Sequence, residues 1–187
     1  MNQMDTSLLD RAILFAVRCH SGVERRGKGF PYIVHPMEAM AIAATMTADQ
    51  EVLAAAALHD VVEDTEVTLD QLRSQFGDRI ARLVDTESDR FGEGLDWRTR
   101  KEESLRRLKG ASRDEKIVAL GDKLSNMRAI ARDYTSKGEV FWDLFHVKDK
   151  SAHAWRYRSL LDALSDLSDT YAYQEFEFLV NRIFPKE

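Results

Sequence analysis

The chain has little of what stabilises a secreted or membrane-embedded protein. Cys19 is the single cysteine among 187 residues, so no disulfide can form within the chain and a reducing compartment is expected. The first residues lack a basic stretch followed by a long apolar run, which a signal peptide would show. No stretch reaches the roughly 20 apolar residues that a membrane span needs. The sequence therefore predicts a cytoplasmic protein without a membrane partner.

An excess of positive charge is also missing. Lys and Arg number 27 against 32 Asp and Glu, which gives a formal net charge of -5 at pH 7. General binding of nucleic acid needs a basic surface, so nucleic acid is not an expected partner. A small anionic ligand is still compatible with the sequence, because a local cluster of cations decides its binding rather than the total charge.

Helix breakers are few, with three Pro and nine Gly. Apolar residues recur at helical spacing through most of the chain, for example in residues 8–17. Thr68 with Gln71, and Ser112 with Glu115, form sequence patterns of capping boxes and predict helix starts. No alternating strand pattern, repeat or low-complexity tract occurs in the sequence. The prediction is an all-α fold, a single compact bundle of about ten helices.

The stretch "AALHDVVEDT", residues 56–65, follows an apolar helical segment with four titratable side chains. On a helix, residues four apart share a face, so His59 would stack with Glu63 and Asp60 with Asp64. Charged groups at the end of a buried segment need a cation, hydrogen bonds or water. A helix end with solvated acids is the competing interpretation, and it stays open for this stretch alone.

At two other positions a polar side chain lies next to an apolar helical segment, as in this stretch. His35 lies just before a proline that can open a helix, and Asp122 ends an apolar run with Asn126 one turn later. With His59 and Asp60 they would supply two imidazoles and two carboxylates, a plausible nitrogen and oxygen site for a divalent ion. The lack of a thiolate excludes a thiolate-rich zinc site, whereas Mn²⁺, Fe²⁺ and Zn²⁺ stay open on ligand type. For each of these side chains alone, a structural role is the competing interpretation.

Four stretches in series resemble one protein family. They read "RGKGFPYIVHP", "ALHDVVEDT", "DTESDRFGEGLDWRTRK" and "ALGDKLSNMR", and they span most of the chain. In this order they are similar to the HD-superfamily phosphohydrolases. More narrowly, they resemble the small alarmone hydrolases, the stand-alone relatives of the hydrolase half of RelA/SpoT-type proteins. The resemblance implies one HD-type hydrolase domain over residues 1–187, without the synthetase half.

The resemblance also implies a reaction and a metal site. Such enzymes cut guanosine tetra- or pentaphosphate at the 3′ position, which releases pyrophosphate and leaves GDP or GTP. The metal, usually Mn²⁺, would be held by His35, His59, Asp60 and Asp122. The catalytic pair would be Glu63 and Asp64, with Glu63 as the main base. A carboxylate one turn beyond the ligands can accept a proton from water activated by a divalent ion.

The resemblance implies a guanine nucleotide as the small-molecule partner and assigns it further contacts. Arg26 would stack on the guanine base, with Tyr32 in the same pocket wall. Asn126 would lie near the ribose and phosphates, and Lys101 would meet a phosphate. Other candidate phosphate cations are Arg25, Lys28, Arg98, Arg100, Lys123 and Arg128. For each of these alone, a solvated surface charge is the competing interpretation.

The sequence departs from the family pattern at three places. Ser125 stands where a His is frequent, and Ala129 stands where a Thr often follows the Arg of "NMR". Residues 88–90 read "SDR", whereas the family has a Ser-x-Asp-Lys stretch there. None of these positions is an expected metal ligand, so the departures concern base and ribose recognition rather than the chemistry.

Three other functions stay open at this point. An HD phosphohydrolase could act on another nucleotide, as an NADPH phosphatase or a nucleotidase. A non-catalytic module could bind the alarmone without cutting it, although such a binder would not need Glu63, Asp64 and a full set of metal ligands. A helical interaction protein could use the same polar residues for structure alone, and the absence of bound metal would favour it.

Overall fold

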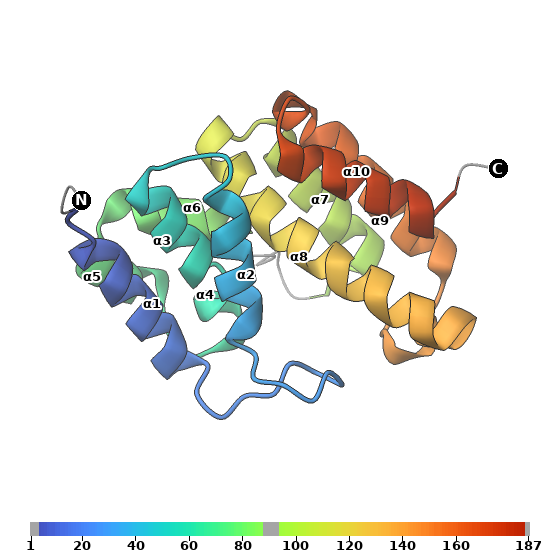
Figure 1. The fold of residues 1–187 in the computed structure, drawn as a ribbon, viewed down its shortest axis with the longest axis horizontal. Helices are drawn as coiled ribbons and strands as arrows, with labels where there is room; N and C mark the ends of the chain where they lie inside the picture. The colour runs from blue at the N-terminus through green and yellow to red at the C-terminus, as the bar shows by residue number, and fades with distance from the viewer. Residues whose placement is uncertain (1–3, 88–93, 186–187) are drawn as a thin grey trace.

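The computed structural model describes residues 4–87 and 94–185 (Figure 1). The α-helices are α1 (Ser7–Cys19), α2 (Val34–Ala43), α3 (Gln50–Leu58), α4 (Val61–Asp64), α5 (Leu69–Phe76), α6 (Asp78–Glu87), α7 (Trp97–Lys109), α8 (Arg113–Lys137), α9 (Lys150–Ala163) and α10 (Tyr171–Ile183). The 3₁₀ helices Gly138–Leu144 and Ser165–Leu167 lie after α8 and α9. No strand occurs in the described residues, and the predicted all-α class is confirmed. The sequence departure at residues 88–90 lies outside the described ranges.

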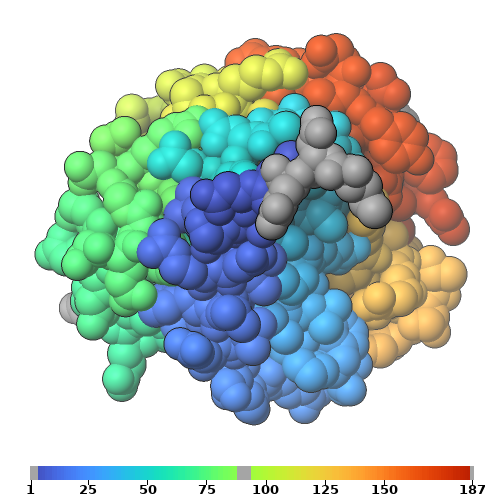
Figure 2. Space-filling model, turned by 60° about the vertical axis from the view of Figure 1, so that its left-hand side comes forward, coloured from blue at the N-terminus to red at the C-terminus, as the bar shows by residue number. Residues whose placement is uncertain are grey.

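Helix α8 runs through the middle of the molecule (Figure 1). Helix α2 packs along α8, and α3 packs against α1, α2 and α6. Helix α10 packs against α8 and α9, and α9 packs against α7 on the same side of the molecule. The space-filling view shows α1 (dark blue) on a face bordered by α5 and α6 (green) and by the segment that leads into α2 (lighter blue) (Figure 2). Across the described residues, no helix combines the length and apolar character that crossing a bilayer requires.

Two of the helices begin at the caps that the sequence predicts. The Thr68 side chain accepts a hydrogen bond from the backbone of Gln71 before α5, and Ser112 accepts one from Glu115 before α8. Both capping boxes are complete, so they satisfy backbone N–H groups that have no partner inside the helix. The second box sets the start of the long helix that carries Asp122.

The contact between α2 and α8 depends on Gly121. A Cβ atom added at this position would lie 2.6 Å from the carbonyl oxygen of Ala39, far inside van der Waals contact. Glycine alone lets the two backbones approach this closely, because it has no side chain. Helix α2 carries His35 and α8 carries Asp122, so the same close approach brings these two predicted ligands together.

Helix α3 is completely buried over residues 54–58 and ends there. His59 and Asp60 form a turn, and the four-residue helix α4 follows directly. The helical face that the sequence predicted for His59 and Glu63 is therefore interrupted. The interruption lets the side chains of the turn reach across to groups on α2 and α8, while Glu63 stays on the separate short helix.

Candidate active site

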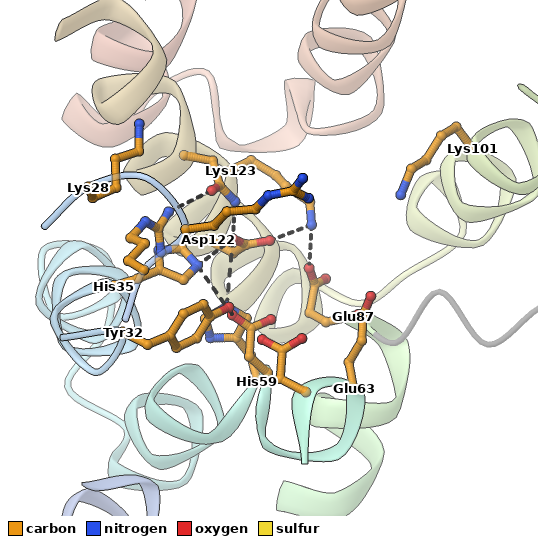
Figure 3. Close-up of a pocket in the computed structure, with 14 residues that line it drawn as sticks. Lys28, Tyr32, His35, His59, Glu63, Glu87, Lys101, Asp122 and Lys123 are labelled. Atoms are coloured by element: carbon orange, nitrogen blue, oxygen red, sulfur yellow. Dashed lines mark hydrogen bonds and ion pairs between the residues drawn. The ribbon is translucent and has the colours of Figure 1, made fainter. Parts of the chain in front are cut away.

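Four predicted ligands from three parts of the fold converge in one cluster, and Figure 3 labels three of them, His35, His59 and Asp122. His35 comes from α2 and Asp122 from α8. Nε2 of His35 lies 3.3 Å from Oδ2 of Asp60 and 3.1 Å from Oδ1 of Asp122. Nε2 of His59 lies 3.0 Å from Oδ2 of Asp60 and 3.6 Å from Oδ1 of Asp122. Each imidazole therefore faces both carboxylates.

Hydrogen bonds on the outer side of the rings hold both imidazoles in place. Nδ1 of His59 lies 2.8 Å from the carbonyl oxygen of Ala56, which can only accept, so Nδ1 carries the ring proton of neutral His59. Nδ1 of His35 lies 2.8 Å from Oγ of Ser125. Nε2 of His59 is buried and makes no hydrogen bond of acceptable geometry in the described structure. A lone pair on Nε2 with an anchored Nδ1 is the arrangement that metal-binding histidines adopt.

The cluster favours a positive charge at its centre. Burial disfavours charged His59, but the carboxylates of Asp60 and Asp122 outweigh burial and raise the pKa of His59 well above its ordinary value. Burial alone would raise the pKa of Asp122, yet the Lys123 ammonium and the two imidazoles hold it well below its usual range. The donor atoms of His35, His59 and Asp60 lie within 4.8 Å of one another. These residues could hold a divalent ion, which would supply the charge that the cluster favours.

The cluster opens into a pocket of about 360 Å³. Every residue predicted for the site lines it, namely Arg26, Tyr32, His35, His59, Asp60, Glu63, Asp64, Lys101, Asp122 and Asn126. Of the other candidate cations, Arg25, Lys28 and Lys123 line the same pocket. The fold thus brings together residues that the sequence singled out in separate segments.

Three further candidate cations do not belong to the pocket lining that the described residues form. The guanidinium carbon of Arg98 lies 3.2 Å from the centre of the Trp155 ring. Arg128 pairs with Glu175 through an Nε to Oε1 distance of 2.7 Å. Arg100 is the third, and its Nε atom is buried without a hydrogen bond in the described structure. These three side chains therefore fit the competing interpretation, a surface or packing charge, better than a role in binding phosphate.

The predicted catalytic carboxylates lie on α4, directly after the metal cluster. Glu63 and Asp64 line the pocket, and both residues are open to solvent at its mouth. Protein atoms packed around the Glu63 carboxyl, together with the charge of Asp60, nevertheless raise the pKa of Glu63 above its ordinary value. A carboxylate with a raised pKa is a stronger base than an ordinary glutamate, which suits it to accept a proton from water.

Tyr32 belongs to the pocket wall, and it also supports the cluster. Its hydroxyl donates a hydrogen bond to Oδ2 of Asp60 at 2.6 Å. Its ring lies against the buried ring of His20, with centroids 4.9 Å apart. Burial and the charge of Asp60 raise the pKa of Tyr32, so the hydroxyl keeps its proton and remains a donor. This bond orients the Asp60 carboxylate, a role that the sequence did not indicate.

Basic side chains in the loop before α2 are held by partners on α8. Nη2 of Arg25 donates to Oδ1 of Asn126 at 2.8 Å, and Lys28 forms an ion pair with Asp133. The amide of Asn126 also donates to Oδ1 of Asp122. Asn126 therefore links this loop to a predicted metal ligand.

Glu87, at the end of α6, is a pocket residue that the sequence did not indicate. Nζ of Lys123 lies 3.1 Å from Oε2 of Glu87 and also contacts Asp122. Burial would lower the pKa of Lys123, but the two carboxylates raise it, so the ammonium stays charged. No motif marks Glu87, because only the packing of α6 against α8 brings it to the site.

Lys101 lies across the pocket from the cluster, on α7 (Figure 3). Burial and the nearby charges of Arg156 and Lys123 lower its pKa to about 8. Arg26 is exposed at the pocket mouth. The pocket therefore combines a cluster of carboxylates and imidazoles that suits a metal ion with basic side chains that suit phosphates.

A family model described as an HD domain matches residues 12–144. This range covers more than half of the chain and contains all four predicted metal ligands. The chain belongs to the HD domain family.

Relatives of this HD-domain chain are found among much longer proteins. It is 30% identical, over 96% of its length, to a guanosine-3′,5′-bis(diphosphate) 3′-pyrophosphohydrolase of Aquifex aeolicus. It is 39% identical, over 83% of its length, to a protein of the same name from Haemophilus influenzae. It is 38% identical, over 87% of its length, to a GTP pyrophosphokinase of Streptomyces coelicolor. The chain covers 26%, 24% and 20% of these relatives, about a quarter or less of their lengths.

Two solved structures share the fold of this HD domain. One is described as a metazoan ortholog of SpoT that hydrolyzes ppGpp, and it matches with a TM-score of 0.75 at 23% identity over 98% of this chain and 97% of that one. The other, a protein of Listeria monocytogenes, matches with a TM-score of 0.73 at 28% identity over 81% of this chain and 99% of that one. At 23% identity the first likeness shows the fold alone.

Proposed function

We propose that this HD domain is a metal-dependent 3′-pyrophosphohydrolase that converts guanosine tetra- and pentaphosphate to GDP and GTP. The observation that carries the proposal is a cluster of two imidazoles and two carboxylates beside Glu63, in a pocket with basic walls. The names of the Aquifex and Haemophilus relatives support the choice of substrate. We assign residues 1–187 to a single hydrolase domain.

Mn²⁺ is the metal that we assign to the site. The ligands would be His35, His59, Asp60 and Asp122. The choice of Mn²⁺ among the divalent ions that these ligand types accept follows the family resemblance. Nε2 of His59, which makes no hydrogen bond in the described structure, is a donor atom that a metal ion would satisfy. When bound, such an ion supplies positive charge beside the phosphate oxygens and lowers the pKa of its water.

The carboxylates on α4 carry the proton transfer in this proposal. Glu63 accepts a proton from the attacking water, and Asp64 orients that water. The water oxygen forms a bond to the phosphorus attached to the 3′ oxygen of the ribose, and the bond between that phosphorus and the 3′ oxygen breaks. The 3′ oxygen takes up a proton, so one water is consumed and the products are pyrophosphate and the 3′-hydroxyl nucleotide. The raised pKa of Glu63 suits it both to accept this proton and to return it.

The remaining pocket residues bind the nucleotide. The exposed guanidinium of Arg26 stacks on the guanine base, since it is planar and stays charged. The Tyr32 ring forms the wall beside it. Asn126 lies near the ribose and phosphates, and Lys101 meets a phosphate on the far side of the pocket from the metal cluster.

The test is an Mn²⁺-dependent hydrolysis assay on guanosine tetraphosphate, with products separated by ion exchange. We expect GDP and pyrophosphate, and we expect both to disappear on chelation and in Glu63→Gln. Glu66→Gln is the matched control, because Glu66 is exposed, lies three residues further on, and is not part of the pocket lining of the described structure. No turnover despite tightly bound Mn²⁺ would reject the alarmone substrate. A panel of nucleotides that includes NADPH would then identify the substrate.

A further inference from the structure

Ser125 starts a chain of hydrogen bonds that leads from the metal cluster to α10. Its Oγ lies 2.8 Å from Nδ1 of His35 and donates to Oε2 of Glu38 at 2.7 Å. Oε1 of Glu38 accepts a bond from Nη1 of Arg128 at 3.1 Å. Arg128 is held in turn by both carboxylate oxygens of Glu175, each at 2.7 Å. The inner end of this chain is buried, because Ser125 is only 1% exposed.

The donors and acceptors in this chain determine where the ring proton of His35 lies. The Glu38 carboxylate only accepts, so the single hydroxyl proton of Ser125 is used in the bond to Glu38. Oγ of Ser125 can then only accept a hydrogen bond from the ring. Neutral His35 therefore carries its proton on Nδ1 and its lone pair on Nε2, which faces the two carboxylates of the cluster.

We propose that Ser125 and Glu38 act together as a positioning relay that fixes the tautomer and ring orientation of His35 for metal binding. The proposal rests on the metal centre of the proposed function. Metal-binding histidines generally donate their second N–H to a carboxylate, a carbonyl or water. His59 uses a backbone carbonyl for this purpose, whereas His35 reaches a carboxylate through a serine hydroxyl. Neither Ser125 nor Glu38 contacts the substrate in this role.

The placement of the relay explains why two residues are needed. Glu38 lies on α2, one turn after His35, and Ser125 lies on α8 directly opposite. The hydroxyl thus bridges a ring and a carboxylate of the same helix from the facing helix. Arg128 and Glu175 hold the carboxylate at the outer end, which keeps the acceptor aimed at Ser125.

Four variants distinguish a positioning role of Ser125 and Glu38 from a role in packing alone. Ser125→Ala removes the hydroxyl, and Glu38→Ala removes the final acceptor at a half-exposed position where folding is less at risk. Glu38→Gln keeps an oxygen that can accept from Ser125, so it is the conservative variant. Ser136→Ala makes the same change as Ser125→Ala at an exposed position of α8 and is the matched control.

The first readout is the tautomer of neutral His35 in the metal-free protein, measured by ¹⁵N NMR of the imidazole at a pH where the ring carries a single proton. We expect the Nδ1–H form in the wild type, Glu38→Gln and Ser136→Ala. We expect a shift toward the Nε2–H form in Ser125→Ala and Glu38→Ala, since Nδ1 loses its acceptor in the first and gains a free hydroxyl donor in the second. An unchanged tautomer in both of these variants would overturn the relay.

The second readout is Mn²⁺ affinity, measured by calorimetric titration without substrate. Loss of a residue that supports a metal ligand typically costs about 10- to 100-fold in metal affinity, and we expect that loss in Ser125→Ala and Glu38→Ala alone. Wild-type affinity in both would overturn the proposal. Failure of the wild type to bind Mn²⁺ would overturn the metal centre on which the relay depends. Normal Mn²⁺ binding by the wild type without alarmone hydrolysis would overturn the proposed substrate and leave the metal centre and the relay unaffected.

Discussion

Oδ1 of Asp122 lies 3.1 Å from Nε2 of His35, although α8 and α2 are far apart in the sequence. This distance depends on the position next to Asp122, where Gly121 lets α8 approach the backbone of Ala39 in α2. The geometry of the candidate metal centre and the packing of the two helices are therefore coupled. A change in one should alter the other.

Gly121→Ala tests this coupling. The added Cβ atom would lie 2.6 Å from the carbonyl oxygen of Ala39, so the helices must move apart. We expect the free energy of unfolding to fall by about 1–3 kcal/mol, as in overpacked cores, and Mn²⁺ affinity to fall with it. Urea unfolding and metal titration measure the two effects. Gly110→Ala is the control, because its Cβ would lie 3.7 Å from the Arg107 carbonyl oxygen, an ordinary contact. Equal stability and equal affinity in the two variants would contradict the coupling.

Asp60→Ala should remove metal binding and activity together. Oδ2 of Asp60 lies close to Nε2 of both His35 and His59, so its loss leaves Asp122 as the one carboxylate of the described cluster that faces both rings. Titration with Mn²⁺ and the hydrolysis assay measure the two losses. Asp70→Ala is a control at an exposed position on α5, where 89% of the side chain is accessible. Full activity of Asp60→Ala at ordinary metal concentrations would remove Asp60 from the ligand set.

The grouping of the site residues in one pocket could be predicted because they lie in four stretches that resemble one family. The sequences around His35, His59 and Asp122 show polar side chains at the ends of apolar helical segments, which packing alone does not require. The helix starts at α5 and α8 could be predicted for a similar reason, because a capping box is a local pattern.

Features that depend on contacts between distant segments could not be predicted. The turn at His59 and Asp60 places these side chains against His35 on α2 and Asp122 on α8, contacts that the local helical pattern does not contain. Glu87 and Glu38 lie on ordinary amphipathic or apolar helices, and only the packing against α8 brings them to Lys123 and Ser125. Ser125 was visible in the sequence only as a departure from the family pattern.

Glu63→Gln should keep Mn²⁺ bound and lose turnover. The amide cannot accept a proton from water, and loss of a general base typically lowers the rate about 10²- to 10⁴-fold. Metal titration and the rate of hydrolysis test the two parts separately. An unchanged rate with bound Mn²⁺ would mean that another group is the base.

The pH dependence of kcat/KM provides a second test of Glu63. The base acts in its deprotonated form, and the protein atoms packed around the Glu63 carboxyl, together with the charge of Asp60, raise its pKa. Activity should therefore be complete above the pKa that Glu63 has in the metal-loaded enzyme and decline as the pH falls through it. The measurement is made at saturating Mn²⁺, and the residual activity of Glu63→Gln should lack this acidic limb. The same limb in wild type and variant would assign it to another group.

Arg26→Ala should raise KM for guanosine tetraphosphate with little change in kcat. A guanidinium that stacks on the base contributes equally before and during the reaction, so its loss weakens binding without slowing the chemical step. Steady-state kinetics separate the two constants. Arg11→Ala, an exposed change on α1 away from this pocket, should leave both unchanged. A loss confined to kcat would contradict the stacking role.

Lys101 should make substrate binding sensitive to alkaline pH. Its pKa is lowered to about 8, so the side chain is charged below this pH and loses its charge as the pH rises through it. Phosphate groups already carry their full charge there, since their second pKa is about 6, so a rise in KM that begins near pH 8 does not come from the phosphates. Lys101→Arg should abolish the rise, because a guanidinium stays charged over this range. Lys109→Arg, at an exposed residue that pairs with Asp162, should keep the wild-type profile. A wild-type KM that stays constant from about pH 7 to about pH 9.5 would show that Lys101 does not meet a phosphate, because the loss of its charge would then leave binding unaffected.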